Sequence, residues 1–228
     1  MVVPKSWSDV TLLNFKLAFD HNEDDIDFLS FICDCEPEEL EDLTVTQFNR
    51  MKEELHWMGE YPTKELTRFE DYWPIEFDLM TVGEFVDLES LVDKGVMKNL
   101  CEMANILVRK DTIYSGQYYS PIEYVPVTAV YKHVIDFLNW RTELLREFSG
   151  LFQSVTKEED FRGESEAEKR RRLRDEAIEL DKTKRWSWFG FIHSLAKGDI
   201  TKLEECTRMH LRTALNLKLY EKIYKISQ

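Results

Sequence analysis

The feature that most constrains this sequence is a helix-start signal that occurs several times along it. Each copy has an apolar residue, a threonine, an acid or amide three residues after the threonine, and a phenylalanine four residues after it. In such a signal the threonine side chain caps the helix, the acid or amide returns a hydrogen bond, and the apolar residue packs on the phenylalanine across the first turn. Full copies occupy residues 10–15, 43–48 and 80–85, and a partial copy at Ile200 has Glu205 in place of the phenylalanine.

Two interpretations of this repetition are open. A helical protein whose helices simply begin with favourable caps would show the same signal. Alternatively, the recurring phenylalanine indicates that similar helices dock in a similar way. Neither interpretation is catalytic, so the signal predicts structure and leaves the function to other residues.

The composition indicates a folded, helix-rich protein. Only 8 Gly and 6 Pro occur among 228 residues, of which 43% are hydrophobic and 32% are charged, and a chain of this length buries a substantial core. Alternating apolar and charged residues from Ile75 to Leu79 predict a short strand, which we expect to pair with the segment around Phe69. The expected fold class is therefore mainly α, a multi-helix bundle-like architecture with one small β-hairpin.

Helical spacing of apolar residues predicts the main elements. The strongest pattern is a long helix from Pro126 to about Phe152, and a second begins at Thr44 with Val45 on its inner face. A further helix after Val96 is apolar on a broad face, and the last one begins at Thr201 with Leu211, Leu215, Leu219 and Ile223 inward. The expected organisation is an N-terminal helical part (1–60), a hairpin with a helical core (61–156), and a charged segment with C-terminal helices (157–228).

The charge balance bears on partners and location. A net charge of −14 argues against direct binding to nucleic acid, because such binding needs a surplus of Lys and Arg. No apolar run approaches the roughly 20 residues that span a bilayer, and the first ten residues lack the apolar centre of a secretory signal. We therefore expect no membrane partner, and a location in the cytoplasm.

The segment between Lys157 and Arg185 departs from the rest of the chain. Its acids and bases nearly balance, and it contains a basic cluster at 169–174. The cluster alone is compatible with a nucleic-acid or import signal. The carboxylates on either side neutralise it within a turn or two, which favours a solvated helix or linker.

The residues that usually carry chemistry form no recognisable site. The four cysteines (Cys33, Cys35, Cys101 and Cys206) match no usual zinc spacing, and we expect reduced, mostly buried thiols. The acidic stretch after Asp20 lacks the glycine and the bidentate acid of a calcium loop, and the five histidines are scattered. With no phosphate loop and no nucleophile motif either, the sequence predicts a protein without cofactor or metal, and not an enzyme.

Two aromatic clusters are candidate contact surfaces. The first is a loop of tyrosines with Gly and Pro, and the second follows the charged segment. Local packing over a helix end explains the tyrosine loop equally well. The candidate contact residues are Tyr114, Tyr118, Tyr119, Trp186, Trp188, Phe189 and Phe191.

Two stretches of the chain resemble a known group of proteins. One is the element Met80-Thr81-Val82-Gly83-Glu84-Phe85-Val86-Asp87-Leu88, preceded by the short strand. The other is the end of the chain, which contains Trp186-Ser187-Trp188-Phe189, residues 195–202 and Tyr220-Glu221-Lys222. Both are similar to small proteins encoded among the structural genes of tailed bacteriophages, with the crAss-like phages as the nearest group.

The resemblance implies a non-enzymatic role in building a phage particle. A tail, neck or baseplate assembly chaperone would act in the host cytoplasm, whereas a permanent minor structural subunit near the portal or tail would stay in the virion. Other phage structural proteins are the implied partners in both cases. Because the group offers no catalytic or ligand residue to match, the resemblance implies no site of that kind, and it leaves the oligomeric state open.

Overall fold

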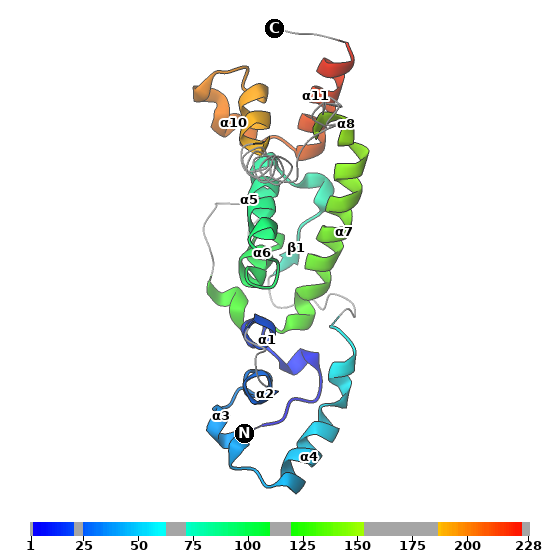
Figure 1. Ribbon diagram of the computed structural model, residues 1–228. Helices are drawn as coiled ribbons and strands as arrows, with labels where there is room; N and C mark the ends of the chain where they lie inside the picture. The colour runs from blue at the N-terminus through cyan, green and yellow to red at the C-terminus, as the bar shows by residue number, and fades with distance from the viewer. Residues whose placement is uncertain (1, 21–24, 63–71, 110–119, 153–186, 225–228) are drawn as a thin grey trace, which may run out of the picture. The chain divides into compact units, whose positions relative to one another are not determined.

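The computed structural model describes residues 2–20, 25–62, 72–109, 120–152 and 187–224 (Figure 1). The fold is mainly α, as the sequence predicts. Contacts between Cα atoms divide the chain into unit 1 (Met1–Phe77 with Asp87–Arg141) and unit 2 (Asp78–Val86 with Thr142–Gln228). Each unit is therefore assembled from two separate stretches of chain, which differs from the three consecutive parts expected from composition.

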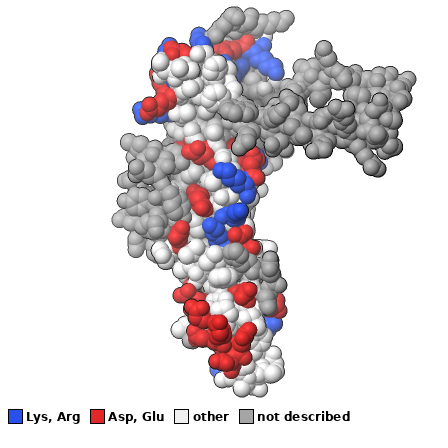
Figure 2. Space-filling view, turned by 60° about the vertical axis from the view of Figure 1, so that its left-hand side comes forward, with Lys and Arg blue, Asp and Glu red and all other residues white. Residues whose placement is uncertain are grey.

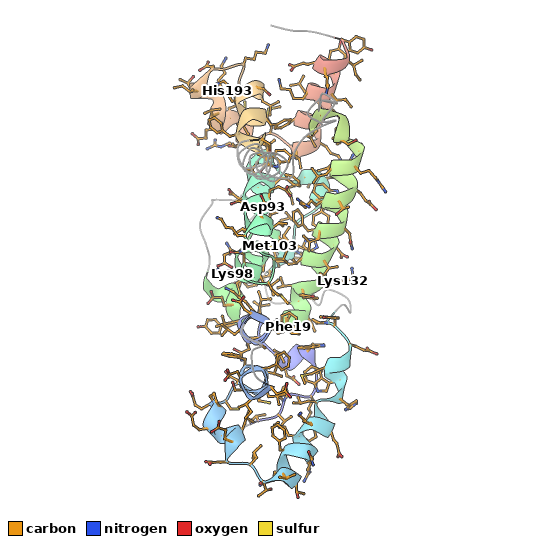
Figure 3. The ribbon with its side chains drawn as sticks, viewed as in Figure 1. Phe19, Asp93, Lys98, Met103, Lys132 and His193 are labelled. Atoms are coloured by element: carbon orange, nitrogen blue, oxygen red, sulfur yellow. The ribbon has the colours of Figure 1, made fainter. Side chains whose placement is uncertain are left out.

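Unit 1 contains the N-terminal helices and the buried helix α6. Inside it, α1 packs against α2 and α6, and Met103 of α6 is fully buried (Figure 3). The broad buried face predicted after Val96 is confirmed, although α6 begins only at Leu100. The elements that belong wholly to unit 1 are η1 (Trp7–Asp9), α1 (Leu12–Asp20), α2 (Asp25–Cys33), α3 (Pro37–Glu41), α4 (Val45–Glu54), η2 (His56–Gly59), β1 (Trp73–Pro74), α6 (Leu100–Leu107), β2 (Val108–Arg109), η4 (Ser120–Tyr124) and η5 (Val127–Ala129).

The small β-element differs from the predicted hairpin. The strand predicted at Ile75–Leu79 is wrong, because η3 (Phe77–Leu79) is a 3-10 helix there. Strand β1 instead precedes that segment and pairs antiparallel with β2. The predicted pairing partner, Phe69, lies outside the described residues. The ring of Phe77 stacks on His133 at a centroid distance of 4.7 Å. The local pattern suggests a strand, and such a pattern does not include tertiary contacts of this kind.

Within unit 1, the first helix-start signal is anchored to a distant segment. Thr11 forms an isolated antiparallel bridge with Pro126. The Leu12 N–H donates to the Val125 carbonyl at 2.8 Å, and the Val127 N–H donates to the Val10 carbonyl at 2.9 Å. Val10, Leu12 and Phe15 are at most 1% exposed. The start of α1 is therefore fixed by backbone pairing on one side and by apolar burial on the other.

Within unit 2, the signal at Thr81 is anchored in the same way. Thr81 forms an antiparallel bridge with His210, the Val82 N–H donates to the Met209 carbonyl, and the Leu211 N–H donates to the Met80 carbonyl, both at 2.9 Å. Met80, Val82 and Phe85 are at most 1% exposed. These two copies of the signal thus support the interpretation that the repeated phenylalanine marks helices that dock in a similar way.

The caps themselves follow the prediction at three of the four positions. Thr44 and Gln47 form a complete capping box at α4, and Thr81 and Glu84 exchange the corresponding bonds at α5 (Val82–Asp93). Thr11 accepts from the Asn14 N–H at 3.1 Å. The fourth box is wrong, because the side chain of Asp199 takes the capping position and accepts from the Thr201 N–H.

Two predicted long helices are interrupted. The stretch from Pro126 to Phe152 divides into η5, α7 (Tyr131–Glu147) and α8 (Ser149–Phe152). The last stretch divides into η6 (Ile200–Lys202), α10 (Leu203–Thr207) and α11 (Leu211–Ile223), and residues 187–195 before it are also helical. Pro126 and His210 each have an extended ψ near +130° and each pairs with a capping threonine. The long-range bridge therefore sets where the following helix begins.

The predicted position of Val45 is also wrong. It was expected on the inner face of its helix, but it is 78% exposed, whereas Met51 and Leu55 of the same stretch are buried. Val45 is the first residue of α4. The apolar spacing alone does not distinguish the first residue of a helix from those in later turns that face the core.

Candidate protein-interaction surface

Helix α11 has a buried face inside unit 2. Leu211, Ala214 and Leu215 are each at most 1% exposed. Their spacing places them on one side of the helix, and α11 packs against α8. This face accounts for the docking of the helix in its own unit.

The opposite side of α11 is also apolar. Leu217 is 42% exposed, Tyr220 is 52% exposed and Ile223 is 63% exposed, and Tyr224 at the C-cap is 64% exposed. At 100° per residue these side chains fall within one arc that lies opposite the buried face. We call these four residues the α11 apolar face. The rings of Tyr220 and Tyr224 lie 4.5 Å apart between centroids, so the face presents a continuous aromatic surface.

The cations of α11 are not among the residues of this face, and each is already bonded to another group. Arg212 bonds to Asp78 at 3.1 Å and to Glu147 at 3.1 Å. Lys218 donates to Glu221 at 2.6 Å and to the Ser194 carbonyl at 2.9 Å. Lys222 donates to the Gly150 carbonyl. The α11 apolar face therefore carries no charge of its own, and the remaining exposed residues between its members are polar but uncharged.

The aromatic cluster expected to supply contacts is divided by the structure. Trp188 is half-buried, with its ring edge-to-face against Phe85 at 5.0 Å and against Phe191 at 5.5 Å. Phe191 is 9% exposed. Both rings therefore belong to the packing of unit 2. Phe189 differs, because it is 49% exposed and stacks on His193, which Figure 3 labels.

Four of the seven candidate contact residues fall on parts of the chain that the structure does not describe. Tyr114, Tyr118, Tyr119 and Trp186 lie outside the described residues. Their proposed role in contacts stays a prediction.

Sequence reasoning missed the α11 apolar face. It placed Ile223 on the inner side of the last helix, which is wrong, because Ile223 is largely exposed. A signal was present, since Leu217, Tyr220 and Tyr224 repeat at helical spacing on the side opposite Leu211 and Leu215. Apolar residues on both sides of one short helix indicate two contact surfaces.

A strongly acidic surface lies in unit 1. Residues 34–42 contain six exposed carboxylates, at Asp34, Glu36, Glu38, Glu39, Glu41 and Asp42. Figure 2 shows a dense group of carboxylates on the face that it presents. Such a group creates a field that steers cationic partners towards it. It does not by itself define a site.

The buried cysteine thiols and the buried Glu89–Arg141 ion pair indicate structural roles and not reactive ones. Burial raises the pKa of Cys101 to about 12 and that of Cys33 to about 11, so both thiols are protonated and poorly nucleophilic at neutral pH. Cys33, Cys101 and Cys206 are buried, which confirms the prediction of mostly buried thiols, and none of the four cysteines is paired in the structure. Their reduced state stays a prediction. Glu89 is 7% exposed and pairs with Arg141.

The described residues form neither a metal-binding cluster nor a helix that could span a membrane. No group of three or more His, Cys, Asp or Glu side chains there could hold a metal ion. No described helix combines the length and the apolar character needed to cross a bilayer.

The geometry therefore defines a mainly α protein with an exposed, uncharged apolar helix face. Comparison of the chain with protein-family models, with curated proteins and with solved structures gives no match.

Proposed function

We propose that this protein is a non-enzymatic protein–protein interaction factor in the assembly of a bacteriophage tail, neck or baseplate. The observation that carries the interaction role is the α11 apolar face. Large apolar and aromatic side chains grouped on one exposed surface are typical of protein contact sites. Tyrosines in particular supply much of the binding energy where they become buried.

The phage assignment is supported by the resemblance of residues 80–88 and of the C-terminal stretch to phage structural-gene products. Within unit 2, the stretch 80–88 is joined to the start of α11, because the Met80 carbonyl accepts a hydrogen bond from the Leu211 N–H. The residues that carry the resemblance thus include those that hold α11 in place. Tail, neck or portal proteins are the proposed partners, met in the host cytoplasm.

The first test measures where the protein resides during infection. Quantitative mass spectrometry would compare purified particles with the soluble lysate. Presence in the lysate alone, bound to a tail or neck protein, would support the assembly-chaperone role. A fixed copy number in finished particles would instead support the alternative role of a permanent minor subunit. Association with no phage protein in either fraction would contradict both.

A second test connects the role to the surface. Tyr220→Glu places a charge at the centre of the α11 apolar face, and we expect it to weaken capture of the phage partner by about tenfold or more. Val45→Glu is the control, because it adds the same carboxylate at an exposed apolar side chain of unit 1. Equal capture by both variants would remove the α11 apolar face from the proposed function.

A further inference from the structure

We propose that the α11 apolar face binds the same face of a second copy of this chain, so that two α11 helices pair antiparallel about a two-fold axis near Tyr220. The inference rests on the proposed function and deepens it: the α11 apolar face joins two copies of the chain, and the phage partner binds the dimer that this face forms. It commits to a homodimer, which the resemblance does not imply.

Charge is the first argument for a second copy. The whole chain carries −14, yet the described residues of unit 2 contain eight acidic and seven basic side chains. Two copies can therefore approach through unit 2 with little repulsion, whereas the acidic residues 34–42 belong to unit 1.

The charges beside the face also disfavour a partner of strong charge. Arg212, Lys218 and Lys222 each bond within unit 2, and Glu221 bonds to Lys218. Among the described residues of α11, a basic or acidic partner helix would meet no unpaired charge of opposite sign. An uncharged apolar surface complements another surface of the same kind, and the second copy supplies one.

Spacing is the second argument. Thr213, Leu217, Tyr220 and Tyr224 follow one another at intervals of four, three and four residues, which is the spacing of residues in the seam between paired helices. All four are exposed. A helix that presents this seam on one side and packs in its own unit on the other has the layout of a dimerisation helix.

The order of side chains along the α11 apolar face is compatible with a two-fold axis. In a two-fold interface, residue i of one copy meets residue j of the other, and j meets i. With the axis near Tyr220, Leu217 of each copy meets Ile223 of the other, and the two Tyr220 rings meet each other.

The experiment measures mass in solution by light scattering after size-exclusion chromatography. The wild-type chain is expected at twice its mass of 27.2 kDa. Tyr220→Glu and Tyr220→Lys, each alone, bring like charges together at the axis, and each is expected to raise the dissociation constant by about tenfold or more. An equimolar mixture of the two is expected to restore the dimer, because opposite charges then meet across the axis.

Val45→Glu is the control for the effect of one added carboxylate and is expected to remain dimeric. Circular dichroism melting of each variant shows that the fold is retained, which the exposure of Tyr220 favours. A wild-type chain that stays monomeric at its highest soluble concentration would overturn the proposal. So would a dimer that resists both Tyr220 substitutions, or a mixture that fails to recover.

The same variants separate this inference from the proposed function. A monomer that captures a phage partner in a Tyr220-dependent way would leave the function standing and overturn the homodimer. A Tyr220-dependent dimer that associates with no phage protein would support the homodimer and contradict the assembly role.

Discussion

The imidazole of His133 lies flat against the ring of Phe77, with centroids 4.7 Å apart and planes inclined by 19°. His133 is 6% exposed, and its Nε2 atom has no hydrogen-bond partner among the described residues. Burial lowers the pKa of His133 to about 4, against smaller opposing effects of Asp136 and the Ile75 backbone. The folded protein therefore holds this side chain neutral at physiological pH.

Protonation of His133 should reduce the stability of unit 1. The ordinary pKa of about 6.5 in the unfolded chain exceeds the folded value of about 4, so between these values the unfolded chain binds the proton more readily. The free energy of unfolding should fall as pH decreases from about 6.5 to 4, by about 3 kcal/mol at most. Urea titrations at several pH values measure this change.

Two variants check the assignment of that pH dependence. His133→Phe keeps an aromatic ring against Phe77 and should flatten the decline between pH 6.5 and 4. His56→Gln removes an exposed histidine and should leave the decline as it is. An unchanged slope in His133→Phe would show that other groups cause the acid sensitivity.

Removing one member of the Glu89–Arg141 pair should destabilise unit 1. The Arg141 guanidinium forms two bonds to the Glu89 carboxylate, one of them at 2.9 Å, and the hydrogen bond to Glu89 raises the pKa of Arg141. Glu89→Ala leaves the Arg141 charge without this partner in a largely buried position, which should cost about 3 kcal/mol. Chemical denaturation measures the loss.

Replacing both members of this pair should be milder. Glu89→Leu combined with Arg141→Leu removes both charges, and most of the lost stability should return. Arg50→Ala, which breaks the exposed pair between Arg50 and Glu54, should cost about 0.5 kcal/mol or less. If Glu89→Ala lowered the free energy of unfolding by no more than Arg50→Ala does, the buried pair would stabilise the protein no more than the exposed pair.

Gly83 should accommodate a side chain poorly. A Cβ atom there would lie 3.3 Å from both the Thr207 Cβ and the Thr207 carbonyl oxygen. Because the contact includes backbone, Gly83→Ala should destabilise unit 2 by about 1–3 kcal/mol. Gly59→Ala meets no atom within 4 Å and should change stability little. A melting temperature for Gly83→Ala at or above that of the wild type would contradict the close approach.

Trp188 should act through packing and not through direct contact with a partner. Its ring touches Phe85 and Phe191 edge-on, so Trp188→Ala should lower the free energy of unfolding by about 2–3 kcal/mol. Phe189→Ala should cost about 1 kcal/mol or less, because Phe189 is about half exposed. Partner binding by Phe189→Ala is then the cleaner test of the predicted aromatic contact. A Trp188→Ala variant of wild-type stability with impaired binding would reverse this assignment.

The sequence by itself determined the mainly α class and most helix starts. Capping is local, because the threonine and the acid or amide three residues later satisfy backbone groups of the same turn. Thr44 with Gln47, and Thr81 with Glu84, could therefore be predicted from adjacent residues alone. The burial of Phe15 and Phe85 followed from the same spacing.

Only the tertiary structure decided which segments pair and which apolar surfaces stay exposed. The bridges from Thr11 to Pro126 and from Thr81 to His210 join residues more than a hundred positions apart. Strand β1 likewise pairs with a strand outside its own segment, because Trp73 lies opposite Arg109. Hydrophobic spacing along one segment indicates that a face is apolar, but it does not indicate which other segment covers that face. The apolar spacing of the last helix placed Leu215 and Ile223 on the same side, whereas in the structure Leu215 is buried in unit 2 and Ile223 is exposed.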